Sequence, residues 1–223
     1  MLLAEDLLLL LLDDEKGTTP GLWVAVRVPL GAAVLAELAI DDAVELEPRE
    51  SRWRTPKIRV TGATEQDDVL AAALQVVAQK PRTAVDLVGR VGDGLKDRLA
   101  ERLAGQGLLE RHDGTVLGLF PRTTWPAAAS THEAQVREGL RAVVVDGAAP
   151  DERTAALAGI LQALDRLRPV LGLSGAEARA AKKRVAELTK GDLATKAVRD
   201  AVEAAIVAVT TATTAATSVA VIS

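Results

Sequence analysis

The stretch AEDLLLLLLDDEKG, residues 4–17, places six consecutive leucines between two acidic clusters. A secretory signal needs a basic leader and a longer apolar run, whereas this run follows Glu5 and Asp6. Six leucines extend only about 9 Å as a helix, against roughly 30 Å of membrane hydrocarbon. The acidic leader suits the positive end of a helix dipole. We therefore predict a short helix over Leu7–Leu12, buried on most sides in a protein core.

The composition is that of a cysteine-free globular protein. The chain has 223 residues, of which 48% are hydrophobic and 26% are charged, enough to bury a sizeable core. The absence of cysteine excludes disulfides and thiolate metal sites and fits a reducing, cytoplasmic compartment. The two histidines, His112 and His132, do not have the usual spacing of metal ligands. We expect no metal and no cofactor.

Amphipathic patterns with a period near 3.6 dominate the rest of the chain. They predict helices over 67–79, 94–107, 151–167 and 175–188, and the segment 30–40, which is apolar nearly all round, is also predicted to be helical. Two strand pairs are also predicted: AVELEP with WRTPKIRVTG, and LLERHDGTVLGLFP with a tight turn at Asp113–Gly114. No repeat and no low-complexity linker divides the chain. The predicted fold is mainly α: a single globular helical domain over residues 1–223 with projecting β-hairpins.

The uncharged segment from Ala204 to Ser223 is the second stretch with a membrane-like composition. Five threonines and two serines interrupt it, and the preceding KAVRDAVEAAIVAV has the pattern of a core helix. We favour a terminal core helix with a frayed tail over 210–223, rather than a membrane-spanning segment.

Charge is unevenly distributed along the chain. Residues 1–48 carry a net charge of −8, whereas residues 49–59 carry a net charge of +4. This basic run contains Arg49, Arg52, Arg54, Lys57 and Arg59. On a protein of net charge −4, the run indicates either a surface that faces an anionic partner or a hairpin that protects its own edge with charge.

The sequence contains no P-loop, no Rossmann glycine fingerprint and no nucleophile elbow. Its paired acids are adjacent rather than facing, so we expect a protein that is not an enzyme. The segment 94–125 resembles a winged helix-turn-helix, which leaves a DNA-binding regulator as an alternative function. Its helix is nearly neutral, and affinity for DNA comes largely from phosphate neutralisation. Nucleic acid is therefore not the expected partner.

Several segments, taken in their order and spacing, resemble the Golgi phosphoprotein 3 family. They are AEDLLLLLLDDEKG, a tryptophan ahead of AELAI, DDAVELE, DDVLAAAL, LKDRLAERLAGQGLLE with its LGLFPRTTWP hairpin, DERTAALAGILQAL and AKKRVAEL. That family comprises peripheral membrane proteins that bind phosphatidylinositol 4-phosphate, and related proteins occur in bacteria. The alanine-, arginine- and valine-rich composition is typical of a bacterial member.

The resemblance implies a single, mostly helical domain with hairpins projecting from one face. It also implies a peripheral adaptor on the cytosolic face of a membrane, with anionic phospholipid, phosphoinositide above all, as its partner. In a bacterium the target would be the inner leaflet of the plasma membrane. The sequence does not identify the protein cargo.

The resemblance further implies a lipid headgroup site built from one tryptophan and three basic residues. The tryptophan falls on Trp23, which on its own chemistry could equally be a core aromatic. The first basic position falls near Leu30 or Gly31, where the charge is missing. Arg27 lies four residues from Trp23, shares its face and could replace that charge. A second basic position falls on Lys96, so we expect Trp23, Arg27 and Lys96 to bind the headgroup.

The third basic position of the family falls on Asp93, which reverses the charge. On its residue chemistry alone, Asp93 is predicted to be the N-cap of the following helix. We also expect Arg52, Arg54 and Lys57, from the basic run, to face the membrane.

An apolar cluster marks the second hairpin: Val116, Leu117, Leu119, Phe120 and Trp125. If this end were packed inside, Arg122 would need a buried partner, and none is evident from the sequence. An exposed apolar tip beside a cation suits a loop that enters a bilayer, since burying each large apolar side chain contributes about 1.5–3 kcal/mol. In the family, the corresponding hairpin is thought to enter the membrane. We predict that Leu117, Leu119 and Phe120 insert; a hairpin packed onto the helices is the alternative.

Overall fold

The structure, a computed structural model, describes residues 1–13, 16–19, 26–47, 55–116, 120–128, 131–188 and 203–211. Its helices are α1 (Leu3–Leu11), α2 (Arg27–Ile40), α3 (Asp68–Ala78), α4 (Ala84–Val91), α5 (Leu95–Gly105), α6 (His132–Val144), α7 (Glu152–Ala163), α8 (Leu167–Leu171) and α9 (Gly175–Leu188). Its strands are β1 (Val44–Leu46), β2 (Lys57–Val60), β3 (Arg82–Thr83), β4 (His112–Val116) and β5 (Phe120–Thr124). Residues 203–211 are also helical. The predicted class, mainly α with small hairpins, is confirmed.

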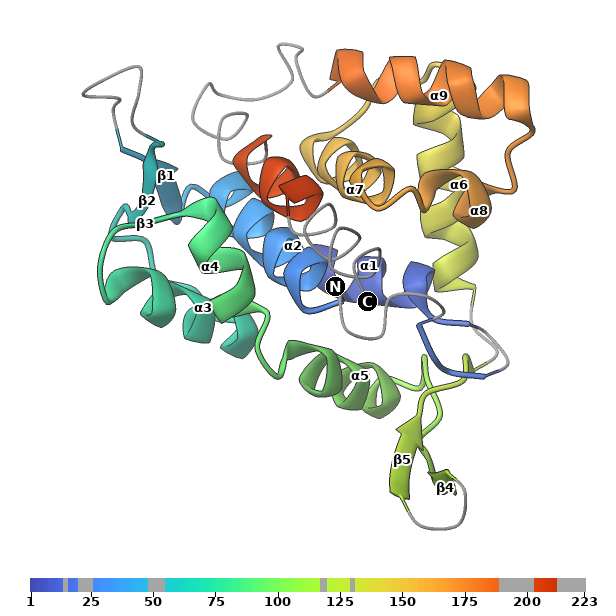
Figure 1. The fold of residues 1–223 in the computed structure, drawn as a ribbon, viewed down its shortest axis with the longest axis horizontal. Helices are drawn as coiled ribbons and strands as arrows, with labels where there is room; N and C mark the ends of the chain where they lie inside the picture. The colour runs from blue at the N-terminus through green and yellow to red at the C-terminus, as the bar shows by residue number, and fades with distance from the viewer. Residues whose placement is uncertain are drawn as a thin grey trace, which may run out of the picture.

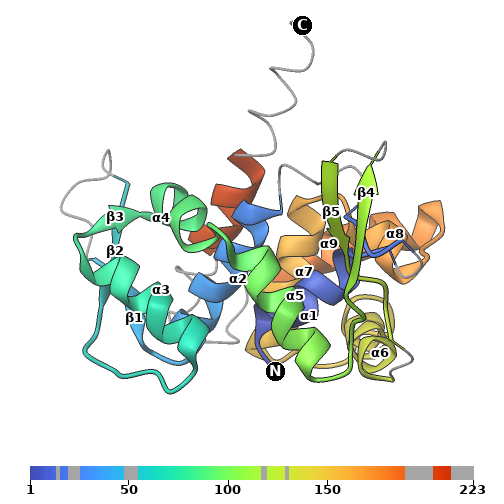
Figure 2. The same cartoon turned by 90° about the horizontal axis from the view of Figure 1, so that it is seen from below.

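Helix α2 lies at the centre of the fold and packs against α1, α3, α4, α5 and α7 (Figure 1). Its sequence is apolar nearly all round, and a helix surrounded by other helices needs no polar face. The β1–β3 sheet lies at one end of the molecule, whereas the β4–β5 hairpin projects from the helical body at the other end (Figures 1 and 2). One continuous hydrophobic core extends from Leu2 to Val209.

The leucine run forms helix α1, which begins at Leu3, four residues earlier than predicted. Its leucines are buried, and Leu7 and Leu8 have no exposed surface. The prediction that this run fills a protein core is therefore confirmed. Within the part of the chain that the structure describes, no helix is both long enough and apolar enough to cross a membrane.

Two buried carboxylates hold α1 in place. Glu5 is fully buried and Glu37 is 3% exposed. The Glu5 carboxylate accepts a hydrogen bond from the backbone N–H of Leu2 (2.7 Å), and Nε of Arg102 lies 2.9 Å from its other oxygen. Glu37, on α2, accepts a hydrogen bond from the backbone N–H of Leu3 (2.6 Å) and pairs with Arg153. The carboxylates thus satisfy donors at the start of α1, which the helix itself leaves unpaired.

Arg102 also joins α5 to α3. Its guanidinium lies 2.6 Å from the carboxylate of Asp67, the N-cap of α3. Burial raises the pKa of Asp67, but hydrogen bonds from Arg102, Val69 and Leu70, together with the charge of Arg102, outweigh it. The pKa of Asp67 is therefore lowered below its ordinary value of 3.8. The ionised form of Asp67 consequently stabilises the fold.

A close crossing of α2 and α4 depends on two glycines. A Cβ atom at Gly31 would lie 2.0 Å from the carbonyl oxygen of Val88. A Cβ atom at Gly92, just after α4, would lie 1.9 Å from the carbonyl oxygen of Arg27. Both obstacles are backbone atoms, which cannot rotate away as a side chain can. The two helices approach so closely because neither position carries a side chain.

Both predicted strand pairs are present, but the second does not turn where we predicted. In the first pair, Val44 lies opposite Val60. In the second, Asp113 lies within β4, opposite Thr123, and the pairing continues as far as Val116 and Phe120. The predicted turn at Asp113–Gly114 is therefore wrong. The hydroxyl of Thr123 donates a hydrogen bond to Asp113 across the strands (2.8 Å), which fixes this register.

The helix predictions differ from the structure in two respects. The predicted helices do not include α4, α6 or α8. The predicted helix over 151–167 corresponds to α7 but ends at Ala163, because Asp165 has a positive φ of 54°, which an α-helix does not accommodate. The predicted terminal helix is present over 203–211, with Ala205, Ala208 and Val209 buried. Residues 212–223 lie outside the described part of the chain.

The close contact of α2 and α4 at Gly31 predicts that a Gly→Ala substitution destabilises the protein there but stabilises it at Gly139, where there is free space. Gly31→Ala should lower the free energy of unfolding by about 1–3 kcal/mol, because the methyl group meets backbone. Gly139→Ala on α6 meets nothing within 4 Å and should raise it by about 0.5–1 kcal/mol. Thermal unfolding should show a lower Tm for the first and a higher Tm for the second. An unchanged Tm for Gly31→Ala would mean that α2 and α4 are not in tight contact.

The lowered pKa of Asp67 predicts a specific loss of stability in acid. Its contribution is present above the ordinary pKa of 3.8 and is lost as the pH falls through the lower pKa of the folded state. Asp67→Asn keeps an N-cap side chain but removes the charge. Urea unfolding between about pH 5 and pH 2 should therefore show a shallower decline for this variant than for the wild type. Parallel declines would show that the ionised Asp67 adds no stability.

Candidate functional site

The structure places two of the three expected headgroup residues. Arg27 is the first residue of α2 and its side chain is 56% exposed. Lys96 lies in the first turn of α5 and is half-buried. Trp23 lies outside the described residues. The grouping of Trp23 with Arg27 and Lys96 therefore stays a prediction.

Asp93 connects these two helices. The prediction that it caps α5 is wrong: the N-cap is Gly94, whose φ of +67° lies in the left-handed region that favours glycine. The Asp93 carboxylate, 79% exposed, lies 3.7 Å from the guanidinium of Arg27 instead. Asp93, which stands where the family has a basic residue, is thus paired with Arg27, the residue that could replace the missing charge near Leu30 and Gly31. Their charges cancel locally.

The missing basic position has a structural explanation. Leu30 has no exposed surface, and Gly31 lies in the crossing of α2 and α4, where no Cβ atom fits. Neither position could present a cation to solvent in this packing. Arg27 is one turn earlier on α2 and lies at its exposed end, which makes it the described cation nearest to these positions along that helix.

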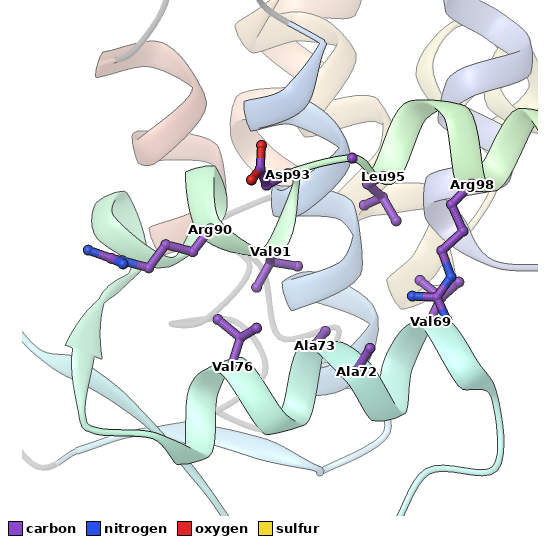
Figure 3. A pocket seen from close by; sticks show the side chains of 10 residues that line it. Val69, Ala72, Ala73, Val76, Arg90, Val91, Asp93, Leu95 and Arg98 are labelled. Atoms are coloured by element: carbon purple, nitrogen blue, oxygen red, sulfur yellow. The ribbon is translucent and has the colours of Figure 1, made fainter.

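An open pocket of about 180 Å³ lies beside Asp93, where α3, α4 and α5 meet (Figure 3). Its wall is apolar, with Val76 and Ala73 of α3 facing Val91 and Leu95. The charged residues that line it are Arg90, Asp93 and Arg98; Arg27 and Lys96 do not line it. The pocket therefore offers an apolar surface with charges at its edge.

The two arginines of this pocket are already paired within the protein. Arg90 lies 3.0 Å from the carboxylate of Asp86, and Arg98 lies 2.6 Å from that of Asp68. The hydrogen bond from Arg98 is the main cause of the lowered pKa of Asp68. Sequence reasoning did not place either arginine at a site. Arg90 lies on α4, which was not predicted, and Arg98 lies two residues after Lys96 and so points to a different side of α5.

The β4–β5 hairpin is anchored to the body at its base. Trp125 is 2% exposed, so its predicted place in the exposed apolar cluster is wrong. It directly follows β5, at the end of the hairpin that joins the body, where Leu109 bridges Ala127. The guanidinium of Arg111 covers the Trp125 ring at 5.7 Å. A buried indole at its base holds the hairpin at a fixed position.

Gly17 completes this anchor. Its carbonyl accepts a hydrogen bond from the backbone N–H of Trp125 (3.0 Å). A Cβ atom at Gly17 would lie 2.2 Å from the backbone of Trp125 and Pro126, and its φ is +57°. Only glycine suits both the space and the conformation. The segment that follows the leucine helix thus also supports the hairpin.

The tip of this hairpin and most of the basic run lie outside the described residues. Leu117 and Leu119 lie outside the described residues, as do Arg52 and Arg54. Phe120 is the first residue of β5, opposite Val116, and its side chain is not described. Lys57 of β2 is exposed. Arg59, also from the run, pairs with Glu45 across the sheet (2.8 Å), as expected of a charged strand edge.

The fold and these surfaces define a helical domain with an anchored, projecting hairpin. Across the described ranges, no group of three or more histidine or acidic side chains is placed to hold a metal ion. The family model of Golgi phosphoprotein 3 (GPP34) matches residues 3–205. The chain belongs to this family, which confirms the resemblance seen in the sequence. A search of curated proteins finds no match.

Proposed function

We propose that this protein is a non-enzymatic peripheral membrane adaptor. It binds anionic phospholipid reversibly, with a phosphoinositide-type headgroup as its preferred ligand, and brings a protein cargo to the cytosolic face of a membrane. The observation that carries the proposal is the family match over residues 3–205. Its support in the fold is a helical body with an anchored, projecting hairpin, which is the architecture that the family resemblance implies.

The headgroup site of this proposal uses Arg27 and Lys96, with Trp23 beside them. Arg27 is more than half exposed, and its pairing distance of 3.7 Å from Asp93 is long for a hydrogen-bonded ion pair. A phosphate group can therefore compete with Asp93 for this guanidinium, because exposed ion pairs contribute only about 0–1 kcal/mol. Binding should be weaker than in a site with three free cations, and strongly dependent on salt.

The membrane contact of the proposal is the hairpin tip. β4 and β5 extend from the body, as Figure 1 shows. The side chains described along β4, from His112 to Thr115, are exposed. The sequence places Leu117 and Leu119 directly beyond β4, and Phe120 at the start of β5. A stiff polar ribbon with apolar residues at its end is suited to insertion, since the charged body stays at headgroup level.

Charge pairing on α5 disfavours the DNA-binding alternative. Arg98 and Arg102, the two arginines of the helix that would enter the major groove, pair with Asp68 and with Glu5 and Asp67. Cations held by carboxylates of the same protein release no counterions from phosphates. Lys96 is the remaining described cation of this helix, which is too little for the phosphate contacts of a duplex.

The headgroup site predicts opposite responses to two sets of substitutions. Arg27→Glu with Lys96→Glu should abolish binding to vesicles that contain phosphatidylinositol 4-phosphate, and should leave the Tm almost unchanged. Asp93→Asn should strengthen binding about fivefold, because one charge near an anionic surface is worth on the order of 1 kcal/mol. Asp97→Asn makes the same charge change on α5 and is the control. Vesicle sedimentation measures the affinity of the wild type and the three variants. Equal increases in affinity for Asp93→Asn and Asp97→Asn would argue against this site.

Insertion of the hairpin tip predicts that vesicle binding can be lost while the fold is kept. Leu119→Asp with Phe120→Asp should remove vesicle binding without unfolding the protein. Leu119→Ser with Phe120→Ser adds no charge and should also weaken binding strongly, since each apolar side chain in the bilayer contributes about 1.5–3 kcal/mol. Thermal unfolding checks the alternative of a packed hairpin, which predicts a destabilisation of several kcal/mol for the aspartate pair. Vesicle binding that survives both double substitutions would rule out insertion of this hairpin.

A further inference from the structure

A second open cavity, of about 430 Å³, lies between the end of α7, α8 and the first turns of α9. Arg168, Arg179 and Lys182 line it together with one acid, Asp165. Its apolar lining includes Leu167 and Leu173, both buried. Figure 1 shows α9 on the side of the body opposite the β4–β5 hairpin. The cavity is therefore separate from the headgroup site and from the hairpin.

Local geometry explains why the three cations converge. The α9 residues that line the cavity lie at positions 175, 178, 179 and 182, which is one face of a helix. Nε of Arg179 donates to the carbonyl of Gly175 (3.1 Å), and Nε of Arg168 donates to the carbonyl of Leu173 (3.3 Å). These bonds orient both guanidiniums through their Nε–H groups. The terminal Nη donors remain for a ligand.

Most described arginines outside this cavity pair with a carboxylate, although Arg184 of α9 contacts the carbonyl of Ala148 instead. Every arginine with a described side chain between residues 27 and 153 lies within 4.0 Å of a carboxylate. Within the described ranges, Arg168, Arg179 and Lys182 have no carboxylate at such a distance. The protein has an excess of acids, with a net charge of −4. Three exposed cations thus line one cavity without a carboxylate partner among the described residues, so their charges are available to an anion.

We propose that this cavity binds the phosphate group of a small phosphomonoester. The two guanidiniums and the ammonium group contact the phosphate oxygens, for which the planar donor pair of arginine is well suited. The apolar part of the ligand lies against Leu167 and Leu173. Asp165 favours a ligand that carries an amine or hydroxyl group near the phosphate, because its carboxylate needs a donor. The phosphomonoester comes either from a soluble compound or from a lipid headgroup.

The test compares two double variants of the full chain. Arg179→Gln with Lys182→Gln removes two cavity cations, whereas Lys80→Gln with Lys183→Gln makes the same charge change at exposed residues that do not line the cavity. Glutamine is a good helix former, so both should fold. Titration calorimetry with phosphoethanolamine should show binding to the wild type and the control, weakened about tenfold or more in the cavity variant. No binding to the wild type, or equal weakening in both variants, overturns the proposal for a soluble ligand.

A second arm identifies the source of the phosphate. Vesicles of phosphatidylcholine with phosphatidic acid present the same group on a lipid. If they bind the wild type and the control but not the cavity variant, the headgroup is the ligand; if the soluble probe alone distinguishes the variants, the ligand is soluble. If neither arm distinguishes them, the cavity is not a phosphate site. Arg27→Glu with Lys96→Glu should leave phosphoethanolamine binding unchanged, so this proposal can fail or succeed independently of membrane docking.

Discussion

The fold depends on neutralising two carboxylates that are buried among leucines. Glu5 and Glu37 have almost no contact with water, and a buried unpaired carboxylate costs several kcal/mol. Arg102 and Arg153 supply the opposite charges from α5 and α7, so the docking of α1 on α2 requires both later helices to be in place. The same arginines reach outward to Asp67 and Asp6. One polar network thereby fixes the relative positions of α1, α2, α3, α5 and α7.

This packing determines where the surface can carry positive charge. Because α2 and α4 meet through Gly31, the region around it is closed to any cation, and the positive charge near the start of α2 comes from Arg27 instead. Asp93 then reduces the effect of that charge. The family fold is thus retained while the electrostatics of its headgroup region differ. The hairpin does not depend on these charges, because its anchor is the buried ring of Trp125 and the backbone of Gly17.

The sequence predicts well the helices that a hydrophobic period determines. It predicts poorly the turns, caps and pockets that depend on tertiary contacts. The leucine run and helix 175–188 have strong patterns, and the structure confirms both. The Asp113–Gly114 pair has the chemistry of a turn, but Asp113 lies within β4, where it accepts a hydrogen bond from Thr123 of the opposite strand. Asp93 has the chemistry of an N-cap, but a distant guanidinium pairs with it. Of the candidate site, the resemblance supplied Trp23 and Lys96, and the spacing to Trp23 suggested Arg27. The apolar pocket beside Asp93 was missed because α4, which forms one of its walls, was not predicted. Its buried residues Ala84, Leu87, Val88 and Val91 do have helical spacing, but the segment is only eight residues long.

The carboxylate network has a consequence for the order of events during synthesis. Glu37 meets an arginine 116 positions later, and Asp6 meets a histidine 126 positions later. At roughly 5–20 residues per second, the ribosome needs about 6–25 s to add that much chain. During this interval α2 is available to pack against the leucine run, but α6 and α7, which also contact α1, are not yet made. The burial of the leucine run is therefore completed only after much of the C-terminal half of the chain has been made.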